Sequence, residues 1–166
     1  MAQERIEHLP SLSRGYFFIL VLVTLDIISK YLAKQFLELN EMIPMIPSLD
    51  LLLVFNTGVA FSMLDFDNAF THYGLSIIGF ILVGYLYLML RKEEVAINYW
   101  ALILIISGAL GNLFDRLLDG EVTDFLYFHT DSFSFFIFNL ADAFISIGAA
   151  IFIIAELRKY LSPQAS

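Results

Sequence analysis

Four stretches of this 166-residue chain are apolar over a length that matches the thickness of a lipid bilayer. A helix needs roughly 20 mostly apolar residues to cross the hydrocarbon core. The chain as a whole is 59% hydrophobic, whereas a soluble domain is about 45–50% apolar. The sequence therefore predicts a single membrane-embedded domain, residues 1–166, with four transmembrane helices. They are expected at residues 16–37, 70–90, 96–118 and 138–157.

The basic residues predict the orientation of these helices. Six of the nine Lys and Arg residues lie before the first span, between the second and third, or after the fourth. The connections on the other side, residues 38–69 and 119–137, contain no Lys or Arg and are rich in Asp and Glu. Because Lys and Arg are enriched in cytoplasmic loops, we expect both termini in the cytoplasm. No small-residue cleavage site follows the first span, so we expect that span to be retained.

The connections on the outer side contain patterns typical of strands. Residues 49–56, LDLLLVFN, are followed by the turn signal NTG and a second short apolar run at residues 59–64. Residues 120–128, GEVTDFLYF, are also strand-like. These patterns predict a small β-structure on the outer face of the membrane.

Polar and charged side chains occur within the apolar stretches in three groups. An ionisable group inside the bilayer costs about 2.5–3.5 kcal/mol, so it suggests a function. Asp26 and Lys30 share one face of the first span, and Asn139 and Asp142 open the fourth. In the expected topology, the polar groups of the third and fourth spans lie at the outer end, beside the loop that holds Asp124. The third span carries a stripe of residues on one helix face: Gly108, Gly111, Asn112, Asp115 and Arg116.

Each group also has a purely structural explanation. The charged pair of the first span would fix that helix to the bundle, and the glycines would let helices approach closely. Asp115 would form a charge pair with its neighbour Arg116, and the asparagines would bridge helix ends. Asp124 would ordinarily be an exposed loop acid. Asp142 is the hardest to explain in this way, because no basic residue precedes it nearby in the chain.

The available side chains favour carboxylate chemistry. The chain has no cysteine, and its three histidines are scattered without the spacing of a zinc peptidase, so neither a metal nor another cofactor is expected. A net charge of −8 argues against a nucleic-acid partner. Two aspartates held close together share a proton and can act as general base and general acid on a peptide bond. Both Asp115 and Asp124 are candidate partners for Asp142.

Five sequence blocks, in this order, resemble the lipoprotein signal peptidase family, or signal peptidase II, of bacteria. The resemblance covers nearly the whole chain. It implies an all-α integral membrane fold with four transmembrane helices, a small extracytoplasmic β-cradle and a short interfacial helix. It also implies an aspartic endopeptidase of the bacterial inner membrane, with its active site near the periplasmic face. The blocks are DxxSK at 26–30, NTGVAFS at 56–62, GALGNLFDRL at 108–117, VTDF at 122–125 and FNLADAFI at 138–145.

The resemblance further implies a substrate and roles for particular residues. The substrate would be a prolipoprotein whose cysteine already carries diacylglyceryl, cut on the amino side of that cysteine. Separately from the resemblance, we expect the enzyme to be a monomer in contact with membrane lipid. The resemblance selects Asp124 as the catalytic partner of Asp142, and it assigns Asp26 and Lys30 to a structural pair. Positions that shape the pocket or hold substrate are matched by Asn56, Gly58, Gly108, Asn112, Asp115, Arg116, Asn139 and Ala141.

Three residues, Ile27, Val59 and Thr123, depart from the family pattern. Val59 adds bulk near the expected substrate groove, so it concerns substrate preference and not the type of reaction. Two other functions use the same carboxylates. A proton-coupled transporter would use them as a relay, although transporters commonly show internal repeats that this chain lacks. A scaffold protein would need Asp124 and Asp142 for stability and would cleave nothing.

Overall fold

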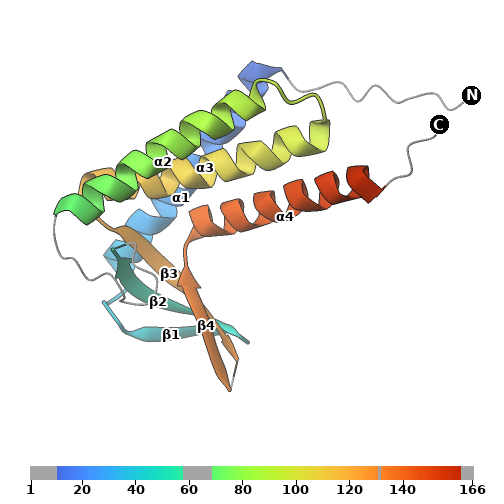
Figure 1. Cartoon of the computed structure of the whole chain (residues 1–166). Coiled ribbons are helices and arrows are strands. Elements are labelled where there is room, and N and C mark those ends of the chain that lie inside the picture. The colour runs from blue at the N-terminus through green and yellow to red at the C-terminus, as the bar shows by residue number, and fades with distance from the viewer. Residues whose placement is uncertain (1–10, 58–68, 131, 162–166) are drawn as a thin grey trace, which may run out of the picture.

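The computed structural model of the chain describes residues 11–57, 69–130 and 132–161, and for residues 69–73 it describes the backbone alone. Helices lie side by side in one part of the molecule, and a sheet projects from one end of them, away from the chain termini (Figure 1). The helices are α1 (Leu12–Phe36), α2 (Ala69–Leu90), α3 (Ala96–Asp119) and α4 (Leu140–Leu161). The strands are β1 (Met42–Ile46), β2 (Leu49–Asn56), β3 (Val122–Thr130) and β4 (Phe133–Phe138).

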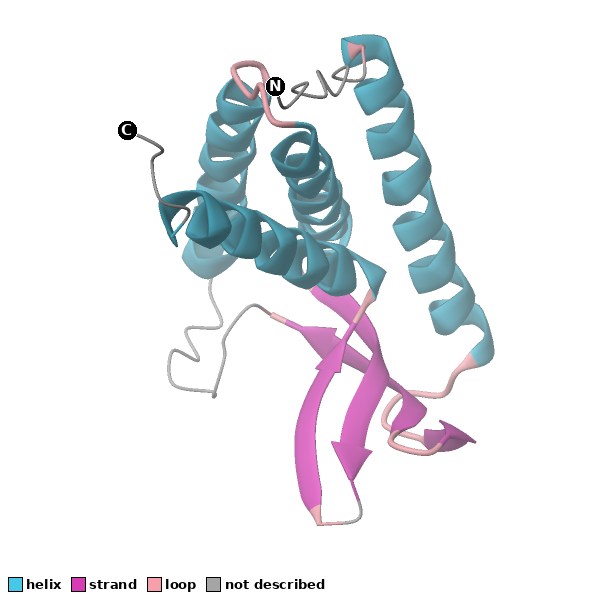
Figure 2. Cartoon of the chain, turned by 90° about the vertical axis from the view of Figure 1, so that its right-hand side faces the viewer, coloured by secondary structure: helices cyan, strands magenta, loops and turns pink. Residues whose placement is uncertain are grey.

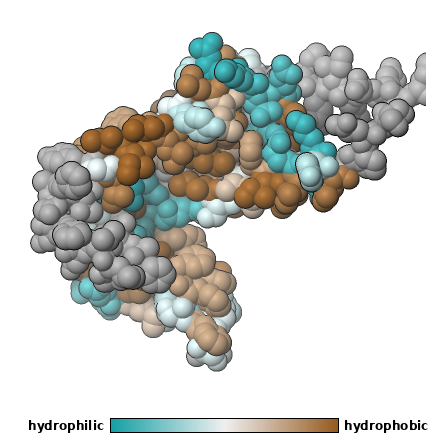
Figure 3. All heavy atoms as spheres, in the orientation of Figure 1, coloured by the Kyte–Doolittle hydropathy of each residue, from teal (hydrophilic) through white to brown (hydrophobic). Residues whose placement is uncertain are grey.

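Three of the helices, α1, α3 and α4, are long and apolar enough to cross a bilayer. The apolar part described for α2, Gly74–Leu90, is shorter, so the number of spans stays a prediction. Large apolar side chains cover the outer helix surfaces; Ile81 and Leu118 are each more than 60% exposed. Such surfaces are unfavourable in water and are accommodated by lipid. Hydrophilic surface lies in the angle between the helices and the sheet and, over a larger area, at the end of the helices away from the sheet (Figure 3).

Helix α3 lies at the centre of the bundle and contacts α1, α2, α4 and β3. In its most apolar window 56% of the residues are buried, against 17% in α1 and 11% in α4. Helix α3 also allows a close approach to α4, because a Cβ atom at Gly108 would collide with the carbonyl oxygen of Ala141. The main apolar core joins α2 to α3 and consists of Leu86, Leu90, Tyr99, Leu102, Ile103 and Ile106.

The four strands form one antiparallel sheet in the order β1-β2-β3-β4. The strands predicted at 49–56 and 120–128 are confirmed as β2 and β3. The hairpin partner of β2 is β1, which precedes it through a turn with Ser48 in the left-handed region (φ 68°). The partner predicted at 59–64 lies outside the described residues. The described residues contain no helix besides α1–α4, so the expected short interfacial helix has no counterpart in that part of the chain.

The sheet is tied to the ends of two helices. Gly120 ends α3 in the left-handed region (φ 81°), and its N–H donates to the carbonyl of Arg116, which closes the helix and turns the chain into β3. Strand β4 then leads through Asn139 into α4, so that the sheet meets the N-terminal end of α4 (Figure 2). As a result, the end of α3, the start of β3 and the start of α4 lie together.

Candidate active site

Asp124 lies near the start of β3 and is buried, with an exposed fraction of 3%. Both oxygens of its carboxylate accept a hydrogen bond from an amide. Asn139 Nδ2 donates to Oδ1 at 2.7 Å, and Asn56 Nδ2 donates to Oδ2 at 3.0 Å. The structural expectation of an exposed loop acid is therefore wrong. Asp124 is a buried carboxylate whose orientation is fixed by two asparagines.

Asp142 lies in the first turn of α4 and is partly exposed. Its Oδ1 accepts a hydrogen bond from Asn112 Nδ2 at 2.7 Å, and its Oδ2 accepts one from the backbone N–H of Asn139 at 3.2 Å. In return, the backbone N–H of Asp142 donates to Asn139 Oδ1 at 2.9 Å. This reciprocal pattern is a capping box, which satisfies free N–H groups at a helix start. The same contacts that begin α4 thus hold the Asp142 side chain in place.

Asn139 connects the two carboxyl groups. It is fully buried, and its side-chain amide reaches Asp124 while its backbone N–H reaches Asp142. Asn139 Nδ2 also lies 3.2 Å from Asn112 Oδ1. The two asparagines expected to bridge helix ends do so, and they also bridge the two aspartates.

Lys30 is buried next to this network, with an exposed fraction of 1%. Its Nζ is 2.8 Å from Asp26 Oδ2 and donates to Asn112 Oδ1 at 2.9 Å. An ammonium group has only donors, so the carbonyl oxygen of Asn112 must face Lys30, and its NH₂ group is left to donate to Asp142. Asp26 Oδ1 in turn accepts a hydrogen bond from the backbone N–H of Ala141 at 2.9 Å. The pair expected to be structural is a buried ion pair that also orients Asn112.

Asp115 belongs to the same buried cluster. Within the described residues its ion-pair partner is Lys30, at 3.4 Å, and not its neighbour Arg116, so the predicted pair between adjacent residues is wrong. The physical reason is that adjacent helix residues point about 100° apart. Asp115 Oδ2 also accepts the backbone N–H of Thr123 at 2.8 Å, which ties α3 to β3. The half-buried Arg116 guanidinium interacts electrostatically with the carboxylates of Asp142, Asp124 and Asp115.

The environment of Asp124 raises its pKa, so this carboxyl group is protonated more readily than an exposed one. Burial raises the pKa of Asp124 from its ordinary value of 3.8 to about 6, and repulsion from Asp142 acts in the same direction. The hydrogen bonds from Asn56 and Asn139 and the charge of Lys30 oppose this rise in the pKa. A carboxyl group that keeps its proton beside a second carboxylate is the arrangement required for acid–base catalysis by a pair.

The remaining predicted residues have supporting positions. A Cβ atom at Gly111 would meet the Asp26 carboxylate, so Gly111, like Gly108, allows close packing. Ala141 is fully buried between these glycines and Asp26. Asn56 is exposed at the end of β2. Gly58 and Val59 lie outside the described residues.

An apolar groove of about 530 Å³ leads to Asp142. The sequence reasoning missed the residues of β4 that form its wall, although the phenylalanine-rich run FSFFIF was a visible signal. Among the described residues, no group of three or more His, Asp or Glu side chains has the arrangement of a metal site. The groove is lined by Phe128, Phe136, Ile137, Phe138, Asp142, Ala143, Ser146 and Ile147.

Comparison with known protein families identifies the family of this chain. The model of the family described as signal peptidase (SPase) II matches residues 18–158. The chain belongs to the signal peptidase II family. As a member, it is a membrane aspartic peptidase, which confirms the prediction made from the five sequence blocks.

Relatives of this signal peptidase II support the assignment. It is 43% identical to the lipoprotein signal peptidase of Sinorhizobium fredii over 142 residues, 84% of each chain. It is 44% identical to that of Mesorhizobium japonicum over 137 residues, 81% of this chain and 80% of the relative. A solved structure described as a bacterial membrane enzyme has a TM-score of 0.76 at 28% identity and covers 93% of both chains.

Proposed function

We propose that this signal peptidase II removes the signal peptide from prolipoproteins that carry diacylglyceryl on cysteine, and that it cuts on the amino side of that cysteine. Asp124 and Asp142 form the catalytic dyad. The observation that carries the proposal is the link through Asn139, which contacts both carboxylates and holds them in one hydrogen-bond network. Asp115 is the weaker candidate, because both Lys30 and the backbone of Thr123 occupy its carboxylate.

The two carboxyl groups have different tasks at the start of the reaction. Asp124, whose pKa is raised to about 6, carries the shared proton and acts as the general acid, and Asp142 acts as the general base. Asp142 takes a proton from a water molecule, whose oxygen attacks the carbonyl carbon of the scissile bond. Asp124 gives its proton to the carbonyl oxygen, so that the tetrahedral intermediate carries no full negative charge.

The second half of the reaction returns the protons. Asp142 donates the proton that it took from water to the leaving amine, and the C–N bond breaks. The hydroxyl of the intermediate returns its proton to Asp124 as the carbonyl re-forms. The products are the signal peptide with a carboxyl terminus and the lipidated cysteine with a free amine. The dyad is restored, and no oxidant, metal or covalent intermediate is required.

The apolar groove beside Asp142 supports a lipid-bearing substrate. Its walls include phenylalanines of β3 and β4 and the first turns of α4, so an acyl chain would lie against apolar surface while the peptide bond meets the dyad. Asn56 and Arg116 hold substrate in this proposal, which is supported by their partial or full exposure near the carboxylates. Asn112, Asn139 and Ala141 are buried beside the carboxylates and shape the site.

The charge distribution supports a position in the bacterial inner membrane with four spans. Arg91, Lys92, Arg158 and Lys159 lie at the helix ends away from the sheet. The positive-inside rule then assigns those ends to the cytoplasm and the dyad to the periplasmic face. Since the chain has no cysteine, single cysteines at Lys92 and Ser134 test this directly. In intact spheroplasts, an impermeant maleimide is expected to label the second position only, and labelling of Lys92→Cys would overturn the orientation.

Cleavage of a defined precursor tests the function. The purified protein in detergent is incubated with a diacylglyceryl-modified prolipoprotein, and the wild type is compared with Asp124→Asn and Asp142→Asn. We expect each variant to lose about a thousandfold or more of the turnover. Asp119→Asn, which removes a surface carboxylate that pairs with Lys34, is the matched control and should cleave normally.

The outcomes separate the possible functions. A folded dyad variant with substantial turnover would overturn the assignment of that residue. Failure of the wild type to cleave, together with loss of stability in both variants, would favour a scaffold role. Equal cleavage of the precursor without diacylglyceryl would contradict the requirement for lipid while leaving the dyad intact.

A further inference from the structure

A second groove lies at the opposite end of the helix bundle from the dyad. It has a volume of about 460 Å³ and is formed where α3 begins and α4 ends. Such a volume lies within the range of roughly 300–1,000 Å³ found for ligand sites. The lining residues are Val95, Ile97, Asn98, Ile151, Ile154, Ala155, Glu156, Arg158 and Lys159.

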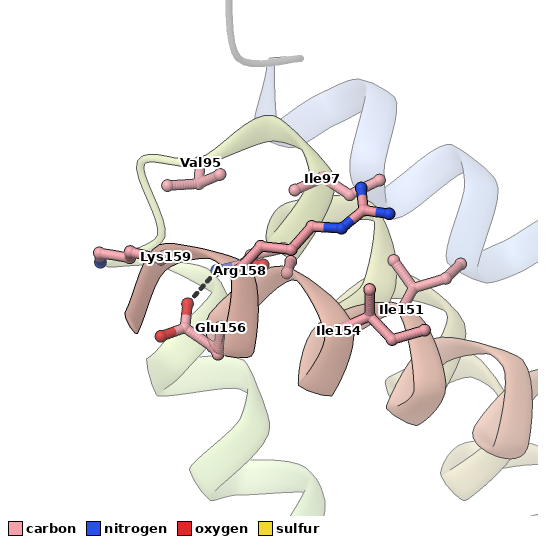
Figure 4. Close-up of a pocket in the computed structure, with 9 residues that line it drawn as sticks. Val95, Ile97, Ile151, Ile154, Glu156, Arg158 and Lys159 are labelled. Atoms are coloured by element: carbon pink, nitrogen blue, oxygen red, sulfur yellow. Dashed lines mark hydrogen bonds between the residues drawn. The ribbon is translucent and has the colours of Figure 1, made fainter. Parts of the chain in front are cut away.

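The walls and the rim of this groove differ in chemistry. Figure 4 shows Val95 and Ile97 on one side and Ile151 and Ile154 on the other, with Arg158 between them. The apolar side chains are largely exposed; Ile97 is 49% and Ile154 is 50% exposed. Arg158 crosses this apolar channel and Lys159 lies at its edge, so apolar surface and basic groups are adjacent, as are the acyl chain and the phosphate of a phospholipid.

The one acidic side chain of the groove is directed to a protein partner. Asn98 Nδ2 donates to Glu156 Oε1 at 2.6 Å, which holds the carboxylate against α3. Figure 4 shows the Glu156 carboxylate and the Arg158 guanidinium extending in different directions from α4. With Arg158 and Lys159 counted against Glu156, the groove has a net positive charge of one.

We propose that this groove binds an anionic glycerophospholipid, with the phosphate at Arg158 and Lys159 and an acyl chain along Ile97, Ile151 and Ile154. Basic pockets between transmembrane helices on the cytoplasmic side are typical sites for anionic head groups. The net charge favours a lipid with one negative charge over a zwitterionic one. The groove is separate from the dyad, so this lipid is not the substrate, and the proposal does not depend on the proposed cleavage reaction.

Lipid binding to the purified full chain tests the proposal. Detergent-solubilised protein is mixed with dioleoyl phosphatidylglycerol, phosphatidylethanolamine or phosphatidylcholine, and bound lipid is measured by native mass spectrometry and by the midpoint of thermal unfolding. We expect phosphatidylglycerol to bind and to raise the midpoint most. The double variant Arg158→Gln/Lys159→Gln should lose about tenfold in binding, since each basic group near an anionic lipid contributes to its attraction.

Two control experiments test whether the change in lipid binding is specific to the groove. Arg91→Gln/Lys92→Gln removes the same charge from the same end of the bundle but from residues outside the groove, and it should bind normally. Ile154→Trp should fill the groove and reduce binding, whereas Ile153→Trp, at an exposed position of α4 outside the lining, should not. Equal losses in both charge variants, no effect of Ile154→Trp, or a preference for either zwitterionic lipid would each overturn the proposal.

Discussion

The side-chain amide of Asn112 donates to the Asp142 carboxylate over 2.7 Å, and its orientation is set by Lys30 on the other side. The contact therefore connects a buried cation of α1 to a carboxylate of α4 through one residue of α3. In this way the helix packing in the apolar interior determines the position of a reactive group at the surface of the bundle.

Replacing Asn112 with Ala is expected to reduce kcat for precursor cleavage about 10–100-fold. A hydrogen bond to a charged group contributes about 1.5–3 kcal/mol, and each 1.36 kcal/mol corresponds to a factor of ten in rate. KM should change less, because Asn112 holds the dyad and not the substrate. Ser107→Ala, which removes another buried polar side chain of α3, is the control and should leave kcat unchanged. An unaltered kcat in Asn112→Ala would contradict the positioning role.

The rate of cleavage is expected to depend on pH in the way set by Asp124. The proposed general acid, Asp124, has a pKa of about 6 and loses its proton as the pH rises through that value, so kcat/KM should decline on the alkaline side. In strong acid both carboxyl groups carry protons and the rate should fall again. The bound substrate excludes water and raises the pKa further, so the alkaline limb of kcat should lie at higher pH than that of kcat/KM. Initial rates between pH 4 and 9 test this, and a flat profile across that range would contradict a shared proton.

Replacing Lys30 with Met is expected to destabilise the protein by about 3–5 kcal/mol, because it leaves the buried carboxylates of Asp26 and Asp115 without their cation. Thermal or denaturant unfolding in detergent measures the change. Lys34→Met breaks the exposed pair with Asp119 and should cost less than about 1 kcal/mol. The combined variant Lys30→Met/Asp26→Asn should recover part of the loss, and similar losses for Lys30→Met and Lys34→Met would contradict the burial argument.

Replacing Gly108 with Ala is expected to lower stability and activity together. The added Cβ would overlap the carbonyl oxygen of Ala141 and would crowd Ile145 at 2.7 Å, so α4 must move away from α3 and carry Asp142 with it. Gly84→Ala is the control, since nothing lies within 4 Å of a Cβ at that position of α2. It should be neutral or stabilising by up to about 1 kcal/mol. Equal behaviour of the two variants would show that the helices can adjust at Gly108.

Hydrophobic length alone predicted the four long helices, and strand patterns predicted β2 and β3. The sequence patterns did not predict the flanking strands β1 and β4, for different reasons. β1 contains Pro44, which is tolerated because the strand lies at the edge of the sheet. In β4, FSFFIF, the apolar residues continue into the apolar start of α4, so no change of period marks the boundary. Edge position and burial depend on the assembled fold, so a local sequence pattern does not predict them.

The candidate site shows a similar division. Spacing and topology placed Asp115, Asp124 and Asp142 at one end of the molecule but left open which of them pair. Their partners depend on contacts between segments far apart in the chain. Lys30 lies 85 residues before Asp115, and Asp115 pairs with this distant lysine and not with the adjacent Arg116 because α1 packs on α3. The resemblance to a family supplied the pairing of Asp124 with Asp142, which residue chemistry alone did not.

The order of the elements along the chain has a consequence for biosynthesis. Asp142 is carried by α4, which leaves the ribosome after α1, α2 and α3, and the network that holds Asp124 also needs Asn139 at the start of that helix. A nascent chain with its first three helices in the membrane therefore lacks one carboxylate and the asparagine that orients the other. With Asp124 and Asp142 as the proposed dyad, we therefore expect the peptidase to stay inactive during its own insertion until α4 docks on α3.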